Sequence, residues 1–220
     1  MSLVEARASR LRITEIFHSL QGESSTVGWP TVFVRLTGCP LRCVWCDTAY
    51  AFGGGQWMEP DEILARVAGF KTNHVTVTGG EPLAQKACLP LLTALCDRGF
   101  RVSLETSGAL DIAPVDPRVT RVMDLKPPGS GEDARNRWSN LEHLRIGDEV
   151  KFVIADRADY DWAVARMAEY DLAARAHILF SPVFGCLEPT RLAEWILADR
   201  LSARFQMQLH KALWGEAVGR

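Results

Sequence analysis

The sequence of 220 residues has no long apolar run, no excess of one charge and no internal repeat. A membrane-spanning helix needs about 20 consecutive apolar residues, and no run approaches that length. Lysine and arginine total 25 against 27 acidic residues, so the composition argues against a protein that coats nucleic acid or an anionic membrane. Residues 1–12 are polar and charged, without the apolar core of a signal peptide. We therefore expect a soluble, cytoplasmic protein.

Disulfides are not expected, because the cytoplasm keeps thiols reduced. The chain has six cysteines, and three of them fall within a single short stretch at positions 39, 43 and 46. The other three, Cys88, Cys96 and Cys186, are scattered, and we interpret them as small buried apolar residues or unreactive thiols.

The pattern of apolar residues predicts one α/β domain that spans residues 1–220. Predicted strands cover residues 11–17, 31–37, 74–78, 101–104, 119–125, 149–154 and 177–180, with a last strand or extended tail at 205–210. Predicted helices cover residues 59–70, 85–98, 159–171 and 189–199, and residues 129–141 read as a mobile loop. Alternation of strand and helix indicates a parallel sheet. Six core units are too few for a closed eight-fold barrel, so we expect a partial, open (β/α)6 barrel.

The cysteine stretch follows the predicted strand 31–37 and has the spacing Cys39-x3-Cys43-x2-Cys46. A structural zinc site normally has four ligands, and a [4Fe–4S] cluster usually takes four cysteine thiolates. Three thiolates on a four-iron cluster leave one iron for a small molecule to chelate. A non-enzymatic metal-binding module stays open as an alternative, either with iron and sulfur or with zinc, although the spacing is unusual for zinc. A distant histidine would then complete a zinc site, with His18, His74 and His210 as the candidates.

Each predicted strand ends in a polar or glycine-containing cluster. In a parallel sheet these ends line one rim, where ligands bind. Glycines at 79 and 80 let backbone approach a ligand closely. We expect Glu81 to accept hydrogen bonds from a cationic amine, Glu105 and Ser107 to bond ribose hydroxyls, and Lys126 to meet a carboxylate. Taken alone, each cluster is an ordinary turn.

Two of these motifs together resemble the radical S-adenosylmethionine superfamily. The cysteine motif has Trp45 just before its last cysteine, and Gly79-Gly80-Glu81-Pro82 is similar to the superfamily's second motif, which binds the methionine amino group. The resemblance implies a [4Fe–4S] cluster whose open iron binds S-adenosylmethionine. It implies that one electron from the cluster cleaves the sulfonium, and that the resulting 5′-deoxyadenosyl radical removes a hydrogen atom from the substrate.

A narrower resemblance covers nearly the whole chain. Ser19-Leu20-Gln21-Gly22-Glu23, Phe33-Val34-Arg35-Leu36, Cys46-Asp47-Thr48 and Gln208-Leu209-His210-Lys211 look like the 7-carboxy-7-deazaguanine synthase family. That family has a trimmed barrel and converts 6-carboxy-5,6,7,8-tetrahydropterin to 7-carboxy-7-deazaguanine with loss of ammonia, a carbon–nitrogen lyase step towards queuosine. The resemblance also implies magnesium, a homodimer and a reductase such as a flavodoxin as electron donor. A glycyl-radical activating enzyme shares the cysteine loop and is the alternative enzyme.

The family resemblance assigns roles position by position. It implies the three cysteines as cluster ligands and Thr48 as the magnesium ligand, since a hydroxyl is a hard oxygen donor. The residues it implies, together with the strand ends, for contacts to S-adenosylmethionine are Trp45, Cys46, Asp47, Gly80, Glu81, Glu105, Ser107, Asp124, Leu125, Lys126 and Ser181. For the substrate they are Leu20, Gln21, Gly22, Glu23, Arg35, Thr78 and His210, with Arg35 on the carboxylate. The family commonly has Ser-Pro-Lys where this chain has Asp124-Leu125-Lys126.

Overall fold

The computed structural model describes residues 10–215, 217 and 219, and it contains one sheet of nine strands in the order β3-β1-β2-β4-β5-β6-β7-β8-β9. The strands are β1 (Leu11–Leu20), β2 (Pro30–Leu36), β3 (Gln56–Met58), β4 (His74–Gly79), β5 (Arg101–Thr106), β6 (Thr120–Asp124), β7 (Glu149–Ile154), β8 (His177–Pro182) and β9 (Arg204–Phe205). Every pair from β2 to β9 is parallel, whereas β1 pairs antiparallel with both β2 and β3. The sheet ends at β3 and β9 without closing, which confirms the predicted open α/β barrel.

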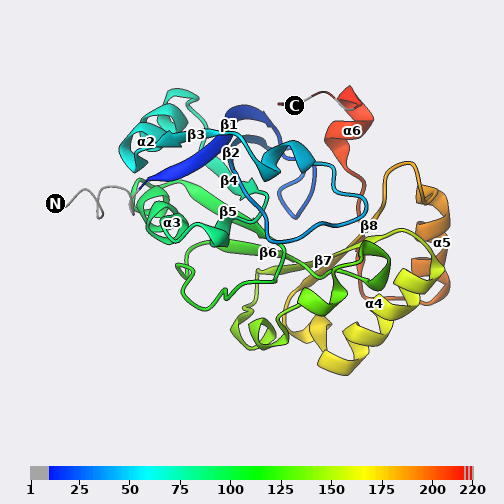
Figure 1. Ribbon diagram of the computed structural model, residues 1–220. Coiled ribbons are helices and arrows are strands. Elements are labelled where there is room, and N and C mark those ends of the chain that lie inside the picture. Colours follow the sequence, from blue (N-terminus) through cyan, green and yellow to red (C-terminus); the bar gives the residue numbers. More distant parts are fainter. Residues whose placement is uncertain (1–9, 216, 218, 220) are drawn as a thin grey trace.

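Four helices connect the parallel strands and pack beside them (Figure 1). They are α2 (Pro60–Gly69), α3 (Cys88–Asp97), α4 (Arg157–Tyr170) and α5 (Pro189–Ala198). Local sequence sets where they begin: Pro60 and Pro189 stand in the first turns of α2 and α5, and the side chain of Asp156 caps α4 by accepting from Asp159 N at 2.9 Å. No helix in the described part of the chain is long and apolar enough to cross a membrane.

Strand alternation separates a core face from a cavity face. On β2 the side chains of Val32, Val34 and Leu36 are fully buried in the core. Phe33 and Arg35 alternate with them and therefore face the other side of the sheet, where they border a cavity. The interruption of an apolar strand by Arg35 thus marks a side chain that points into a site.

The structure differs from the predicted elements in three places. Residues 205–210 are predicted as a last strand or extended tail, but β9 ends at Phe205 and a short helix α6 (Leu209–Trp214) begins at Leu209. The alternation of polar and apolar residues there is too short to decide between strand and helix. The predicted mobile loop at 129–141 contains three short 3-10 segments, and its mobility stays a prediction. Strand β3 was not predicted because its three residues carry too little pattern.

Candidate active site

The cysteine loop leaves the carboxyl end of β2 and returns to the sheet through backbone hydrogen bonds. Gly38, with φ of +100°, donates to Ala51 O at 2.7 Å, and its own carbonyl accepts from Glu81 N at 2.8 Å. Farther along the loop, Val44 N donates to Ser130 O at 3.0 Å. Residues that follow β4 and β6 therefore hold the loop in place.

The loop borders a cavity of about 830 Å³ at the carboxyl ends of the parallel strands. The wall includes all three cysteines of the loop, residues from strands β2 and β4 to β8, and the short helix α6. Cys39, Cys43 and Cys46 are each half-buried. The volume is in the range of cofactor and substrate sites.

The three thiols fit a cluster better than a single metal ion. In the described residues, no group of three or more His, Cys, Asp or Glu side chains converges closely enough to hold one ion. A four-iron cluster takes each thiolate on a different iron, so its ligands need not converge. Burial raises the pKa of the Cys39 and Cys43 thiols, which a bound cationic cluster would have to offset.

Two of the three histidines that could complete a zinc site lie away from the cysteine loop. His74 opens β4, and His18 pairs with Val32 near the start of β2, so both lie at the strand ends opposite the cysteine loop. His210 borders the cavity, and its Nδ1 would lie 2.3 Å from a Cβ on Gly22. Its ring is thus packed against the loop after β1.

Gly79 and Gly80 bring the end of β4 directly against the cysteine loop. A Cβ on Gly79 would lie 2.2 Å from Leu36 O, and one on Gly80 would lie 2.2 Å from Gly38 O and 2.8 Å from Cys39 Cβ. These are backbone and loop atoms with no room to give, so the close approach requires glycine.

Glu81 is turned away from the cavity. It is fully buried, and its carboxylate accepts from Ser107 N at 2.7 Å, Ser107 Oγ at 2.6 Å, Thr106 Oγ1 at 2.9 Å and Leu83 N at 3.0 Å. The prediction that this side chain binds a cationic amine does not agree with this geometry. The carboxylate instead fastens the end of β5 to the end of β4.

Aromatic and polar side chains make the opposite wall of the cavity. Phe17 and Phe33 stack with ring centroids 4.9 Å apart, and the Arg35 guanidinium lies 5.8 Å from the Phe17 centroid. Deeper in the wall, Glu105 accepts from Thr78 Oγ1 at 2.8 Å and from Gln21 Nε2 at 3.3 Å. Burial raises the pKa of Glu105, although Lys151 opposes the rise.

Known proteins resemble the chain along nearly its full length. The family model described as the Radical SAM superfamily matches residues 33–124. The 7-carboxy-7-deazaguanine synthase of Chlorobaculum tepidum is 50% identical over 208 residues, which cover 93% of this chain and 94% of that protein. The synthase of Koribacter versatilis is 43% identical over 93% of this chain and 97% of its own length.

This chain belongs to the 7-carboxy-7-deazaguanine synthase family. The solved structures agree, since the crystal structure of QueE from Escherichia coli matches with a TM-score of 0.75 at 27% identity, covering 91% of this chain and 95% of that one. The radical S-adenosylmethionine superfamily and the enzyme class predicted from the motifs are therefore confirmed.

The structure brings nearly all of the predicted site residues of this synthase family member to one cavity. Every predicted residue lines it except Glu81 and Leu125. Leu125 is fully buried in the core, and its backbone N–H donates to Lys151 O at 2.9 Å. Only its neighbours Asp124 and Lys126 therefore present side chains to the cavity.

A buried chain of charges crosses the cavity floor. Lys151 Nζ lies 2.6 Å from Glu23 Oε2 and 3.5 Å from Asp124 Oδ2, and Lys126 Nζ lies 3.0 Å from the same Asp124 oxygen. Burial would lower the pKa of Lys151, but Glu23 and Asp124 raise it well above its ordinary value. Lys151 thus stays charged and joins the loop after β1 to the end of β6.

The sequence did not predict Lys151 as a site residue, nor the contacts by which α6, which carries the predicted His210, joins two loops. Lys151 interrupts an apolar strand as Arg35 does, so the same argument could have found it. Lys211 Nζ of α6 lies 3.8 Å from Asp47 Oδ2, and Gln208 Nε2 donates to that oxygen at 3.2 Å. Helix α6 also donates from Leu209 N to Gly22 O at 2.9 Å, so it ties the substrate-side loop to the cysteine loop. Such contacts between distant segments have no local signal in the sequence.

Proposed function

We propose that this chain converts 6-carboxy-5,6,7,8-tetrahydropterin to 7-carboxy-7-deazaguanine with release of ammonia. The observation that carries the proposal is the placement of Arg35, between aromatic rings, on the same cavity as Cys39, Cys43 and Cys46. Such a cavity can hold a small planar anion beside a cluster. The family to which the chain belongs supports the same reaction.

Cys39, Cys43 and Cys46 would hold the [4Fe–4S] cluster in this proposal. When bound, the reduced cluster and S-adenosylmethionine supply the one-electron chemistry that removes a hydrogen atom from the substrate. Gly80 lines the cavity and lies against the cysteine loop without a side chain, so its backbone would be open to the cofactor. Ser181 Oγ and Asp124 Oδ1 are buried without a partner among the described residues and line the cavity, so each offers a polar atom to the cofactor.

The substrate would lie along the wall made by β1 and β2. Arg35 would pair with the carboxylate, and the stacked Phe17 and Phe33 offer an apolar surface to the pterin ring. Gln21 and Thr78 present polar groups held by Glu105. Burial lowers the pKa of His210, so the ring is a neutral hydrogen-bonding group at neutral pH.

The proposal also includes a magnesium ion bound by Thr48. Thr48 follows the last cluster cysteine and lines the cavity, with its Oγ1 3.8 Å from Cys46 Sγ. Its hydroxyl would be one hard oxygen ligand, and substrate oxygens and water would complete the coordination of the ion. The homodimer and the flavodoxin-type electron donor stay predictions of the family resemblance, which light scattering and reduction by purified flavodoxin would measure.

The test is an anaerobic assay of the reconstituted protein with dithionite, S-adenosylmethionine, magnesium and the carboxytetrahydropterin. Mass spectrometry should detect 7-carboxy-7-deazaguanine from the wild type and none from Cys43→Ala. Slow release of 5′-deoxyadenosine without deazaguanine would keep radical chemistry and overturn the substrate. That result would favour the alternative of a glycyl-radical activating enzyme. Neither product from a fully loaded protein would leave the non-enzymatic metal module.

A further inference from the structure

The side chain of Arg35 is held in place by a residue that does not line the cavity. Glu15 Oε1 accepts from Arg35 Nε at 2.7 Å, and both side chains are mostly buried, with 19% and 14% of their surfaces exposed. Glu15 is absent from the cavity wall, whereas Arg35 forms part of it. The carboxylate therefore contacts the guanidinium through Nε without itself forming part of the cavity wall.

A β-bulge produces this pairing. Between Ile13 and Glu15 the register of β1 against β2 shifts, so that Ile13 pairs with Leu36 and Glu15 pairs with Arg35. The extra residue, Thr14, turns away and shares a hydrogen bond of 2.7 Å with Thr37 Oγ1. Without the bulge, the alternation of side chains would place Glu15 on the core face together with Ile13.

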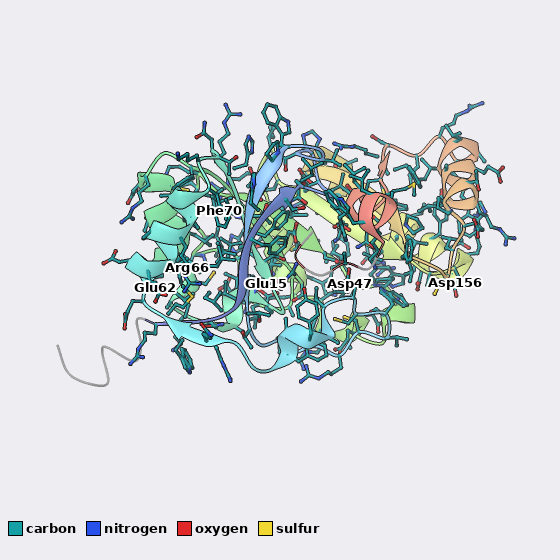
Figure 2. All side chains as sticks on the ribbon, turned by 90° about the horizontal axis from the view of Figure 1, so that it is seen from above. Glu15, Asp47, Glu62, Arg66, Phe70 and Asp156 are labelled. Carbon is teal, nitrogen blue, oxygen red and sulfur yellow. The ribbon has the colours of Figure 1, made fainter. Side chains whose placement is uncertain are left out.

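A second group holds Glu15 in turn. Tyr50 OH donates to the same Glu15 Oε1 at 2.9 Å, and the Tyr50 ring lies 5.9 Å from the Arg35 guanidinium. Burial, followed by contacts with Glu15, raises the pKa of Tyr50 to about 12, so its hydroxyl remains a donor. Figure 2 shows Glu15 on β1, between Arg66 of α2 and Asp47 of the cysteine loop in that view.

We propose that Glu15 and Tyr50 are positioning residues that select a carboxylate on the substrate by fixing the guanidinium of Arg35. Arg35 donates to Glu15 through Nε. In the described part of the chain, neither Nη atom of Arg35 donates to a protein acceptor. The two Nη groups are left for a two-point contact with a planar carboxylate. This inference rests on the proposed function, in which Arg35 binds the substrate carboxylate.

The pairing also predicts that this wall selects a ligand more by hydrogen-bond geometry than by charge. Glu15 and Arg35 together carry no net charge, so a ligand is attracted to this wall less by long-range charge than by the geometry of two hydrogen bonds. A fixed guanidinium loses less side-chain freedom on binding than a mobile one. Removing Glu15 should therefore reduce selectivity for the carboxylate rather than affinity for pterins in general.

The experiment measures the affinities of cluster-loaded protein for 6-carboxypterin and for pterin without the carboxylate. Fluorescence titration is done with S-adenosylmethionine and no reductant. For Glu15→Ala we expect the preference for 6-carboxypterin to fall about tenfold while the affinity for plain pterin changes little. Tyr50→Phe should lose about two- to threefold of the preference. Glu15→Gln keeps an oxygen acceptor for Arg35 Nε and should retain most of it.

Two controls separate positioning from general damage. Glu62→Ala removes an exposed partner of Arg66 in an ion pair of 2.9 Å and should leave both affinities unchanged. In the double variant Glu15→Ala with Arg35→Ala, the loss should equal that of Arg35→Ala alone, because Glu15 acts through Arg35. Equal losses for both ligands in Glu15→Ala, or a loss in Glu15→Gln as large as in Glu15→Ala, would overturn the inference. A wild type without preference for 6-carboxypterin would instead overturn the proposed function.

Discussion

The two sides of the cavity are built by different means. On the cofactor side the wall is formed mainly by backbone. Gly79 and Gly80 pack against the cysteine loop, and the Glu81 carboxylate accepts hydrogen bonds that join the ends of β4 and β5. On the substrate side, and where it meets the cofactor side, the charged side chains of Arg35 and Lys151 reach the cavity from distant strands and are held by other charges. In the proposed function, the cofactor would thus lie against a local motif, whereas the substrate would be recognised by side chains that distant segments hold in place.

The largest expected effect is on the cofactor side, from Gly80→Ala. The added Cβ would lie 2.2 Å from Gly38 O and 2.8 Å from Cys39 Cβ, so the cysteine loop must move. We expect the cluster to be lost or unstable and turnover to fall by about 100-fold or more. Iron content per chain and turnover measure this. Gly69→Ala on α2, where a Cβ meets nothing within 4 Å, is the matched control and should keep both.

The next largest effect should come from Lys151→Met, which breaks the charge network where the two sides meet. Glu23 and Asp124 would be left buried without their shared cation. We expect a loss of about 3 kcal/mol in the free energy of unfolding, measured by chemical denaturation. An unchanged stability would mean that the network contributes nothing to the fold.

The stability lost in Lys151→Met should depend on pH. The pKa of Lys151 is raised in the folded state, so its stabilising charge is fully present below the ordinary pKa of lysine. That contribution is lost as the pH rises through the raised value. The stability difference between wild type and Lys151→Met should therefore be constant near neutral pH and shrink in strongly alkaline solution. A difference that grows with alkalinity contradicts the assignment.

Glu81→Gln should have a smaller effect and sharpens the contrast between the sides. The amide replaces one oxygen with a donor, which then faces the N–H and hydroxyl donors of Ser107 and Thr106. We expect a loss of about 2 kcal/mol in the free energy of unfolding. If Glu81 instead bound the cofactor directly, S-adenosylmethionine affinity would fall at unchanged stability, and equilibrium dialysis would detect that.

Thr48→Val should have the smallest effect, confined to the ion. The substitution keeps the shape of the side chain and removes one hard oxygen, so we expect the magnesium concentration for half-maximal turnover to rise several-fold. Cluster content should not change, because the thiols of Cys39, Cys43 and Cys46 are untouched. An identical magnesium dependence in both proteins would exclude Thr48 as a ligand.

On both sides of the cavity the sequence predicted local motifs better than contacts between distant segments, for physical reasons. The cysteine spacing and Gly79-Gly80 are local, and each carries its own chemistry. The burial of Glu81 was missed because hydrogen bonds to Thr106 and Ser107 cross strands. Likewise, the pairing of Glu15 with Arg35 depends on a bulge whose register no local pattern reveals.

The measurement that tests the contrast between the cofactor side and the substrate side most directly is the set of products that Arg35→Ala forms under anaerobic turnover. We predict that this variant keeps its cluster, still releases 5′-deoxyadenosine slowly from S-adenosylmethionine, and makes almost no 7-carboxy-7-deazaguanine. Formation of the deazaguanine at the wild-type rate would contradict it, because the substrate side would then not depend on the charge that Glu15 and Tyr50 hold in place.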